Sequence, residues 1–331
     1  MRFGRTLLVL SAMVLAVVGC KSGETTATSN ESSGPADGKK YRIGISLPSA
    51  DHGWTAGAIW WAKEATKLYP DVEFDLQTAK DPSEQTSQIE TMMAKNLDGL
   101  VVLATESAPL TPVAKEAHDR GILLVNVDRG FTEPVADVFI EGDNKAFGRK
   151  AAEWMAEKLN GNGNIVILEG IPCTVNTDRV TAAAEVFKKY PGIKILDQQS
   201  GKWNPEESLK VMETFLLKHP KIDAVWASDD DMAIGAEKAI KAAGREKEMW
   251  MLGGGGMKEV VKRIMDGDAM YPATITYPPS MTAVAVQKAV SILRDGKRSS
   301  IMKFMPRHMV IDVDVVEPAN AKDYYFPDSV Y

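Results

Sequence analysis

The acidic run Asp229-Asp230-Asp231 is the densest group of chemically active side chains in this sequence. It lies in IDAVWASDDDMAIGAEKAIKAAG, residues 222–244, whose pattern predicts a strand, a short loop, a helix and a glycine stop. In open α/β sheets, ligands bind at the carboxyl ends of the strands, where this loop is expected. Carboxylates accept hydrogen bonds, so the loop favours a ligand rich in hydroxyl donors. The helix dipole also stabilises carboxylates in a first turn, by about 0.3–1 kcal/mol each, and we expect Asp230 and Asp231 to serve the helix or the loop.

Motifs for metal and enzyme chemistry are missing from the sequence. Its four histidines are scattered, and the acidic run lacks a spaced oxygen-ligand motif, so no metal site is expected. The run Gly253–Gly256 has neither the GK[ST] ending nor the GxGxxG spacing of phosphate loops. Neither Gly-x-Ser-x-Gly nor HExxH occurs. We therefore expect no cofactor, and a binding protein rather than an enzyme.

Other candidate ligand contacts follow other predicted strands. Asp128 and Arg129 end the run LLVNV and offer acceptors beside a guanidinium fork, a pattern that a turn with an ion pair would also produce. His52 and Trp54 follow the first strand, where an indole would stack on the C–H face of a sugar ring or anchor the core. Four further candidates are individually weaker: Asn144, Arg179, Trp203 and Tyr277.

Strand-like apolar runs alternate with amphipathic helical stretches, which predicts βαβ units and parallel sheets. The predicted strands are Tyr41–Leu47, Val72–Gln77, Gly99–Leu103, Leu123–Val127, Val138–Glu141, Ile165–Leu168, Ile193–Leu196, Ala224–Ala227, Trp250–Leu252 and Ala273–Thr276. Residues 98–130 and 222–256 repeat one order: strand, loop, helix, glycine, strand, loop. We therefore expect an α/β fold of two similar doubly wound lobes that face each other across a ligand cleft.

The beginning of the sequence predicts export. Arg2 and Arg5 precede an apolar run, residues 7–18, that is too short to span a membrane, so residues 1–19 are predicted to be a signal peptide. The small residues before Cys20 resemble a bacterial lipobox, which implies cleavage before Cys20 and its acylation. The polar composition of residues 20–40 predicts a flexible tether behind the lipidated cysteine.

Composition limits the class of protein. The apolar fraction of 44% and the charged fraction of 25% are those of a soluble globular protein. The net charge of −6 argues against nucleic acid as a partner. Cys173 is the only cysteine besides Cys20, so acylation of Cys20 leaves no intrachain disulfide.

Four segments, NVDRG, GDNKAFG, ILEGIP followed by an arginine, and DDDMAIGAEKAIKAAG, stand in an order and spacing that resemble the periplasmic sugar-binding proteins of the ribose/galactose type. These proteins are the substrate-binding components of ABC importers. The resemblance runs from Tyr41 to about Gly296 and implies a type I periplasmic binding protein fold, with two Rossmann-like lobes joined by a three-strand hinge. It implies an N-terminal lobe of residues 41–142 plus 276–302 and a C-terminal lobe of residues 143–275 plus 303–331.

The same resemblance implies ligand-binding roles by position. His52 and Trp54 match first-loop contacts, with Trp54 packing on the ring. Asp128 and Arg129 match an acid–arginine pair that holds ring hydroxyls. In the second lobe, Asn144 matches a polar contact, Arg179 an arginine and Trp203 the opposing aromatic. Asp229 matches a position usually held by an amide, and Tyr277 an amide position near the hinge.

One departure concerns Gly254 and Gly255, where the family often has an aromatic–acid pair. The resemblance therefore predicts that one acid and one apolar wall are missing. Our hypothesis is that Asp229 supplies the acid, and that the glycines leave room for a different or larger ligand. It predicts that Asp229→Ala abolishes ligand binding and leaves the melting temperature of the unliganded protein nearly unchanged.

Several functions fit these patterns to different degrees. The first is a monomeric, lipid-anchored binding protein of the periplasm or cell envelope that delivers a monosaccharide or polyol to an ABC permease. The second is a sugar receptor read by a chemotaxis or signalling partner, which the sequence does not separate from the first. A sugar-modifying hydrolase or isomerase would return its ligand chemically changed. A sugar-responsive repressor is disfavoured by the signal peptide and by the acidic balance.

Overall fold

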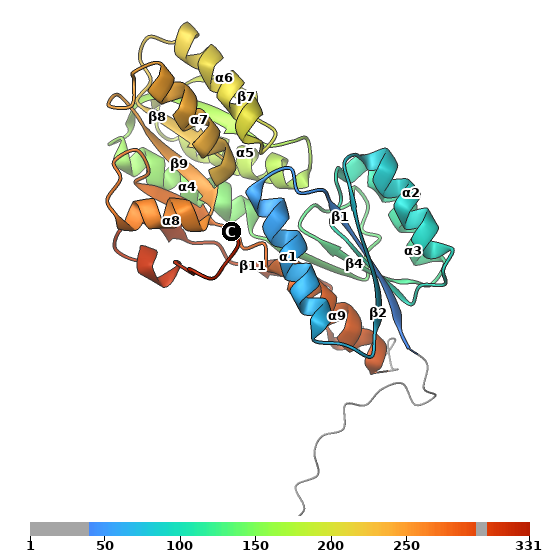
Figure 1. Cartoon of the computed structure of the whole chain (residues 1–331). Coiled ribbons are helices and arrows are strands. Elements are labelled where there is room, and N and C mark those ends of the chain that lie inside the picture. Colours follow the sequence, from blue (N-terminus) through green and yellow to red (C-terminus); the bar gives the residue numbers. More distant parts are fainter. Residues whose placement is uncertain (1–39, 296–302) are drawn as a thin grey trace, which may run out of the picture. The chain divides into compact units, whose positions relative to one another are not determined.

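The computed structural model describes residues 40–295 and 303–331, which all belong to one compact unit, Gly34–Tyr331 (Figure 1). The predicted signal peptide, Cys20 and the predicted tether up to residue 39 lie outside the described residues. Among the helices of the described ranges, none is long and apolar enough to cross a membrane.

Two six-stranded sheets form the framework, in the orders β11-β5-β4-β3-β1-β2 and β12-β10-β9-β8-β6-β7. The strands of the first sheet are β1 (Arg42–Pro48), β2 (Glu73–Ala79), β3 (Gly99–Val102), β4 (Leu123–Val127), β5 (Val138–Gly142) and β11 (His308–Ile311). Those of the second are β6 (Asn162–Glu169), β7 (Gly192–Ser200), β8 (Ala224–Ala227), β9 (Trp250–Gly255), β10 (Ala273–Thr276) and β12 (Val315–Val316). Within the described residues, every pairing of these strands is parallel except that of β10 with β12. The same strand order occurs twice, so the predicted repeat of two doubly wound α/β lobes is confirmed.

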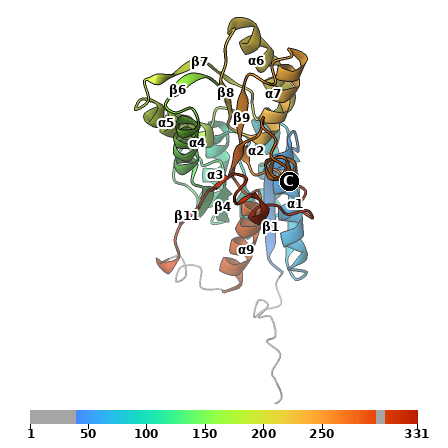
Figure 2. The ribbon, with the colours of Figure 1, turned by 90° about the vertical axis from the view of Figure 1, so that its left-hand side faces the viewer.

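Helices cover both faces of each sheet, as the buried central strands require. They are α1 (Gly53–Lys67), α2 (Pro82–Met93), α3 (Ser107–Asp119), α4 (Asn144–Lys158), α5 (Thr174–Phe187), α6 (Pro205–Lys218), α7 (Asp230–Ala242), α8 (Lys258–Met265) and α9 (Met281–Arg294), followed by the short 3-10 helix η1 (Ala321–Asp323). The N-terminal lobe consists of the first sheet with α2 and α3 on one face and α1 and α9 on the other. In the C-terminal lobe, α4 and α5 lie opposite α6 and α7 across the second sheet (Figure 2).

Capping side chains place the helix starts close to the strand ends. Asp143 accepts the backbone N–H of Ala146 at the start of α4, 2.7 Å away. Asn204 accepts the backbone N–H groups of the two glutamates that open α6, at 2.9 and 3.0 Å. Each such bond satisfies a donor that the first helical turn leaves unpaired. Short β-to-α connections of this kind bring polar loop residues to the carboxyl edge of each sheet.

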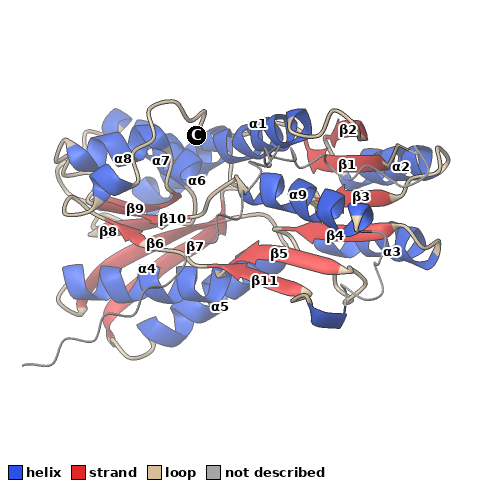
Figure 3. Cartoon of the chain, turned by 90° about the horizontal axis from the view of Figure 1, so that it is seen from below, coloured by secondary structure: helices blue, strands red, loops and turns tan. Residues whose placement is uncertain are grey.

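Three neighbouring segments connect the lobes: the junction of β5 with α4, the segment from β10 to α9, and the segment from β11 to β12. Figure 3 shows β11 beside β5 in the first sheet. The predicted boundary assigned residues 303–331 to the C-terminal lobe, whereas His308–Ile311 pairs with β5. This difference arises because β11 is a short, partly exposed edge strand, and which sheet such a strand joins depends on its neighbours in the fold.

Candidate functional site

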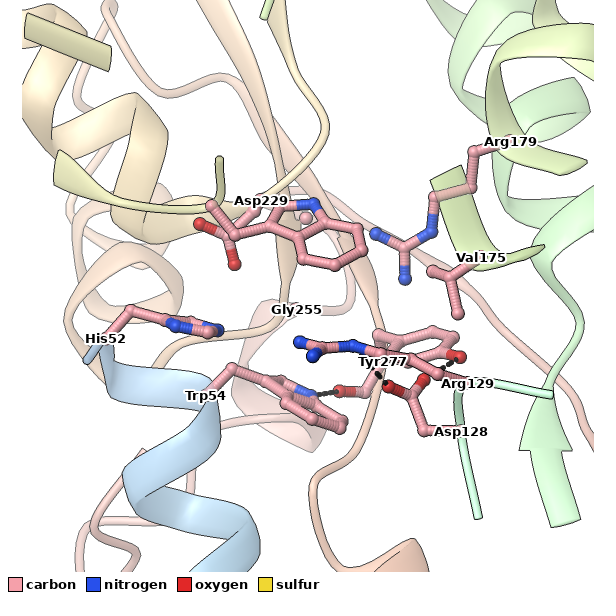
Figure 4. A pocket seen from close by; sticks show the side chains of 11 residues that line it. His52, Trp54, Asp128, Arg129, Val175, Arg179, Asp229, Gly255 and Tyr277 are labelled. Atoms are coloured by element: carbon pink, nitrogen blue, oxygen red, sulfur yellow. Dashed lines mark hydrogen bonds and ion pairs between the residues drawn. The ribbon is translucent and has the colours of Figure 1, made fainter. Parts of the chain in front are cut away.

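A small cavity lies where loops from both lobes meet at the carboxyl edges of the two sheets. It is lined by His52, Trp54, Asp128, Arg129, Val175, Arg179, Trp203, Asp229, Gly254, Gly255 and Tyr277. All of the predicted ligand-binding residues except Asn144 are therefore brought together in one place. Figure 4 shows Trp54 and Asp128 on one side of the cavity and Asp229 and Arg179 on the other.

Asp128 and Arg129 form the polar wall contributed by the N-terminal lobe. Arg129 Nη1 donates to the carbonyl oxygens of Ala104 and Thr105, at 3.1 and 2.8 Å, which fixes the guanidinium. Its Nε lies 3.7 Å from Asp128 Oδ2 and, within the described residues, has no hydrogen-bond partner. Buried donors are usually paired, so this N–H is free for an acceptor on a ligand.

Two indoles provide the apolar surfaces. Trp54 is held by its Nε1, which donates to the carbonyl oxygen of Tyr277 at 2.8 Å. Trp203 lies 5.1 Å from the Arg129 guanidinium, and its own Nε1 is buried without a partner in the described chain. A Cβ on Gly170 would lie 2.0 Å from the Trp203 ring, so only glycine permits this ring position.

Backbone strain is concentrated at the cavity. Asp128, Lys202 and Trp203 have φ values of +64°, +57° and +55°, in the left-handed region that non-glycine residues rarely adopt. The other described non-glycine residues with positive φ are Asn96 and Asn160, which follow helix ends. Strain at bulky residues persists where the surrounding structure holds it, and it clusters at binding sites.

A hydrogen-bonded chain behind the cavity links the lobes. Arg179 Nε donates to Asn144 Oδ1 at 3.0 Å, and Asn144 Nδ2 donates to the hydroxyl oxygen of Tyr277 at 3.1 Å. The Tyr277 hydroxyl donates to Asp128 Oδ1 at 2.6 Å. Both ends of the Asn144 amide are therefore engaged by protein groups, and Asn144 does not line the cavity, whereas the sequence predicted a ligand contact. Burial, followed by the nearby Asp128 carboxylate, raises the pKa of Tyr277 well above its usual value, so its phenol stays neutral.

Asp229 caps a helix and also lines the cavity. Its Oδ1 accepts the backbone N–H of Met232 at 2.9 Å and caps α7. In the described chain no hydrogen bond reaches its second oxygen, which lines the cavity. Burial, followed by the charge of Asp231, raises the pKa of Asp229 well above its usual value. Asp229→Ala would lose this cap, which costs about 1 kcal/mol, and would also remove a buried charge, so the nearly unchanged melting temperature stays a prediction.

Asp229, Asp230 and Asp231 form hydrogen bonds with three different parts of the protein. Asp230 accepts the backbone N–H of Met257 at 2.8 Å and the hydroxyl of Thr274 at 2.8 Å, both within its own lobe. Asp231 reaches the other lobe, where it accepts the N–H groups of Gly53 and Trp54 at 2.9 and 3.3 Å at the start of α1. Across residues 40–295 and 303–331, no three His, Cys, Asp or Glu side chains are arranged to hold a metal ion. The contact between Asp231 and the other lobe was not anticipated, since no local pattern reports it.

The glycine run does not leave the room that the sequence hypothesis expected. A Cβ on Gly254 would lie 2.3 Å from Phe147 Cζ, and a Cβ on Gly255 would lie 2.1 Å from the hydroxyl oxygen of Tyr331. Aromatic side chains from α4 and from the last residue of the sequence thus occupy the space above the glycines. Together with Val175, a lining residue that the sequence analysis missed, they keep the cavity small.

Comparisons with known proteins agree with this architecture. Residues 43–298 match the family model described as periplasmic binding protein domain. The chain is 30% identical over 243 residues to the D-ribose/D-allose-binding protein of Pseudomonas aeruginosa, covering 72% of this chain and 76% of that protein. It is 30% identical over 268 residues to a galactofuranose-binding protein of Escherichia coli (strain K12), covering 77% and 82%.

Solved structures show the same fold. The fructose-binding periplasmic domain of a hybrid two-component system has a TM-score of 0.78 and 31% identity, covering 86% of this chain and 93% of that one. A galactofuranose-binding protein has a TM-score of 0.80 and 26% identity, covering 88% and 100%. The matched proteins are binding proteins, which confirms the prediction of a substrate-binding protein rather than an enzyme. The chain belongs to the periplasmic binding protein domain family and has its type I fold.

Proposed function

We propose that this protein captures a monosaccharide or a related polyol between its lobes and delivers it to the permease of an ABC importer. The observation that carries the proposal is the composition of the cavity, which two acids, two arginines and two indoles from both lobes line together.

Each wall of the cavity has a proposed role. Asp128 and Asp229 accept hydrogen bonds from ligand hydroxyls, and Arg129 and Arg179 donate to ligand oxygens. Trp54 and Trp203 pack against the carbon skeleton. The named sugars of the relatives, among them ribose, allose and galactofuranose, support this ligand class.

Closure of the lobes is the proposed mechanism. Asp231 bonds α1 across the cleft, and on the other side Gly130 N donates to Thr174 Oγ1 at 3.0 Å. A ligand that contacts both lobes adds to these bonds and so favours the closed arrangement, which the permease would recognise.

Native mass spectrometry of the purified protein, followed by a thermal-shift panel of pentoses, hexoses and polyols, tests the proposal. We expect a retained ligand or a raised melting temperature with at least one compound. A protein that binds none of them would refute the proposed function, and a ligand returned chemically changed would indicate an enzyme.

We further propose that the mature protein is a monomer anchored through an acylated Cys20. Detergent phase partitioning of wild type and of Cys20→Ser tests the anchor, and only the wild type should enter the detergent phase. A signalling role is the second candidate, favoured by the 31% identity to the periplasmic domain of a hybrid two-component system. Co-purification with a permease or with a histidine kinase distinguishes the two.

A further inference from the structure

Asn144 and Tyr277 lie in two of the three segments that connect the lobes. Asn144 is the first residue of α4, directly after β5, and Tyr277 directly follows β10. Each residue is only 3% exposed. A Cβ on Gly142, the last residue of β5, would lie 2.2 Å from Tyr277 Cε2, so only glycine permits this position of the ring. The two connecting segments are therefore in close contact beside the cavity.

The hydrogen bonds through these two side chains all run in one direction. A guanidinium has only donors, so Arg179 Nε donates to Asn144 Oδ1 at 3.0 Å and fixes the orientation of the amide. Asn144 Nδ2 therefore faces the Tyr277 hydroxyl oxygen, 3.1 Å away, and donates to it. The hydroxyl proton is left for Asp128 Oδ1, at 2.6 Å (Figure 4). The chain thus begins at a cation of the C-terminal lobe and ends at an acid of the N-terminal lobe, and hydrogen bonds in such a chain polarise and strengthen one another.

Tyr277 also holds cavity residues by its ring and by its backbone. The guanidinium carbon of Arg179 lies 4.3 Å from the centre of the Tyr277 ring and 3.8 Å from that of Phe147, so two aromatic rings confine this cation. The Tyr277 carbonyl oxygen accepts the Nε1–H of Trp54 at 2.8 Å. Arg179, Trp54 and Asp128 all line the cavity. One tyrosine therefore contacts cavity-lining groups of both lobes.

We propose that Tyr277 is a positioning residue for ligand binding, and that with Asn144 it couples the Asp128 carboxylate of one lobe to the Arg179 guanidinium of the other. Both charged groups are held in place before a ligand enters, so ordering them costs less when it binds. The inference rests on the proposed function. It gives the Tyr277 hydroxyl a role through its neighbours, whereas the sequence predicted a direct contact with the ligand.

Tyr277→Phe and Asn144→Ala test the inference, because each removes one link of the chain and leaves Asp128 and Arg179 in the sequence. The probe is whichever of D-ribose, D-allose, D-fructose, xylitol and myo-inositol binds the wild type most tightly by isothermal titration calorimetry. We expect each variant to weaken that binding about 5- to 30-fold, less than the roughly 10- to 150-fold effect of losing a hydrogen bond to a charged ligand contact. The double variant should bind no more than about twofold more weakly than the weaker single variant, since either change breaks the same chain.

Three results would overturn the positioning role. The first is wild-type affinity in folded Tyr277→Phe. The second is wild-type affinity in Asn144→Ala together with a weakened Tyr277→Phe, which would indicate a direct bond from the Tyr277 hydroxyl to the ligand, since Asn144 does not line the cavity. The third is a double variant in which the two effects multiply. Asn144→Ser replaces the alanine variant if that variant does not fold.

Tyr271→Phe is the matched control for the loss of a buried tyrosine hydroxyl. Tyr271 is fully buried, its hydroxyl donates to Glu237 Oε2 at 2.9 Å, and the guanidinium carbon of Arg263 lies 3.9 Å from its ring centre. This environment matches that of Tyr277 but lies outside the cavity, so the control should melt at a lower temperature and bind the probe as the wild type does. Equally weakened binding in the control would overturn the inference. A wild type that binds no member of the panel would instead refute the proposed function itself.

Discussion

Replacing Asp229 by asparagine separates the two tasks of this side chain. Asparagine caps helices as well as aspartate does, so the bond to the N–H of Met232 is expected to persist. The substitution removes the negative charge and turns one cavity-facing acceptor into a donor. Ligand binding and protein stability should therefore change in opposite directions.

The expected size of each change follows from the contacts. A hydrogen bond from a ligand hydroxyl to a carboxylate contributes about 1.5–3 kcal/mol, so Asp229→Asn should weaken binding roughly 10- to 150-fold. The raised pKa means that the folded protein holds this proton more tightly than the unfolded chain, so ionisation destabilises the fold as pH rises above about 4. The unliganded Asn variant should consequently melt higher than wild type near neutral pH, with the difference shrinking toward pH 4.

Calorimetry provides both measurements. Titration calorimetry gives the ligand affinity, and scanning calorimetry of the unliganded proteins from about pH 4 to 8 gives the melting temperatures. Asp81→Asn is the matched control, because it makes the same change at the cap of α2, away from the cavity. Unaltered affinity in Asp229→Asn would refute its role as a ligand acceptor, and a pH-independent difference in melting temperature would refute the linkage argument.

Three further substitutions test other parts of the structure. Asp231→Ala leaves two N–H groups of α1 unpaired in the closed cleft and should weaken ligand binding by about 1–3 kcal/mol, measured by titration calorimetry. Burial alone would raise the pKa of Glu237, but hydrogen bonds led by the one from Arg263 outweigh it and lower the pKa to about 2. Glu237→Gln should therefore lower the melting temperature at neutral pH, by an amount that diminishes as the pH falls from about 4.5 toward 2. Gly254→Ala places a Cβ against Phe147 and should destabilise the protein by about 1–3 kcal/mol in urea unfolding, and unchanged stability would contradict the packing described for the glycine run.

Much of the fold was readable from local patterns. The predicted strands Leu123–Val127, Ala224–Ala227 and Ala273–Thr276 coincide with β4, β8 and β10. These strands are almost fully buried, so their sequences are mostly apolar and are bounded by polar loops. The edge strands β11 and β12 were missed, because they are short and partly exposed and depend on their neighbours for pairing.

The sequence also predicted part of the candidate site correctly and part of it incorrectly. Asp128, Arg129 and Asp229 follow strands directly, and the carboxyl edge of a parallel sheet is where ligands bind. Asn144 met the same criterion, yet protein groups occupy its amide. Whether a polar side chain faces the cavity or supports another residue depends on distances that the sequence pattern does not contain.

The sequence by itself determined the two-lobed α/β architecture, because apolar periodicity and helix capping act over a few residues. It also determined the polar and aromatic chemistry of the cleft, since these residues stand at the ends of recognisable strands. Only the tertiary structure decided that Asp229, Asp230 and Asp231 serve a cavity, their own lobe and the opposite lobe. Likewise, it brought Tyr331 to Gly255, 76 positions earlier in the sequence (331 minus 255), where the missing side chain of the glycine makes space for a hydroxyl. Contacts between residues so far apart arise from the packing of the lobes, which no local pattern encodes.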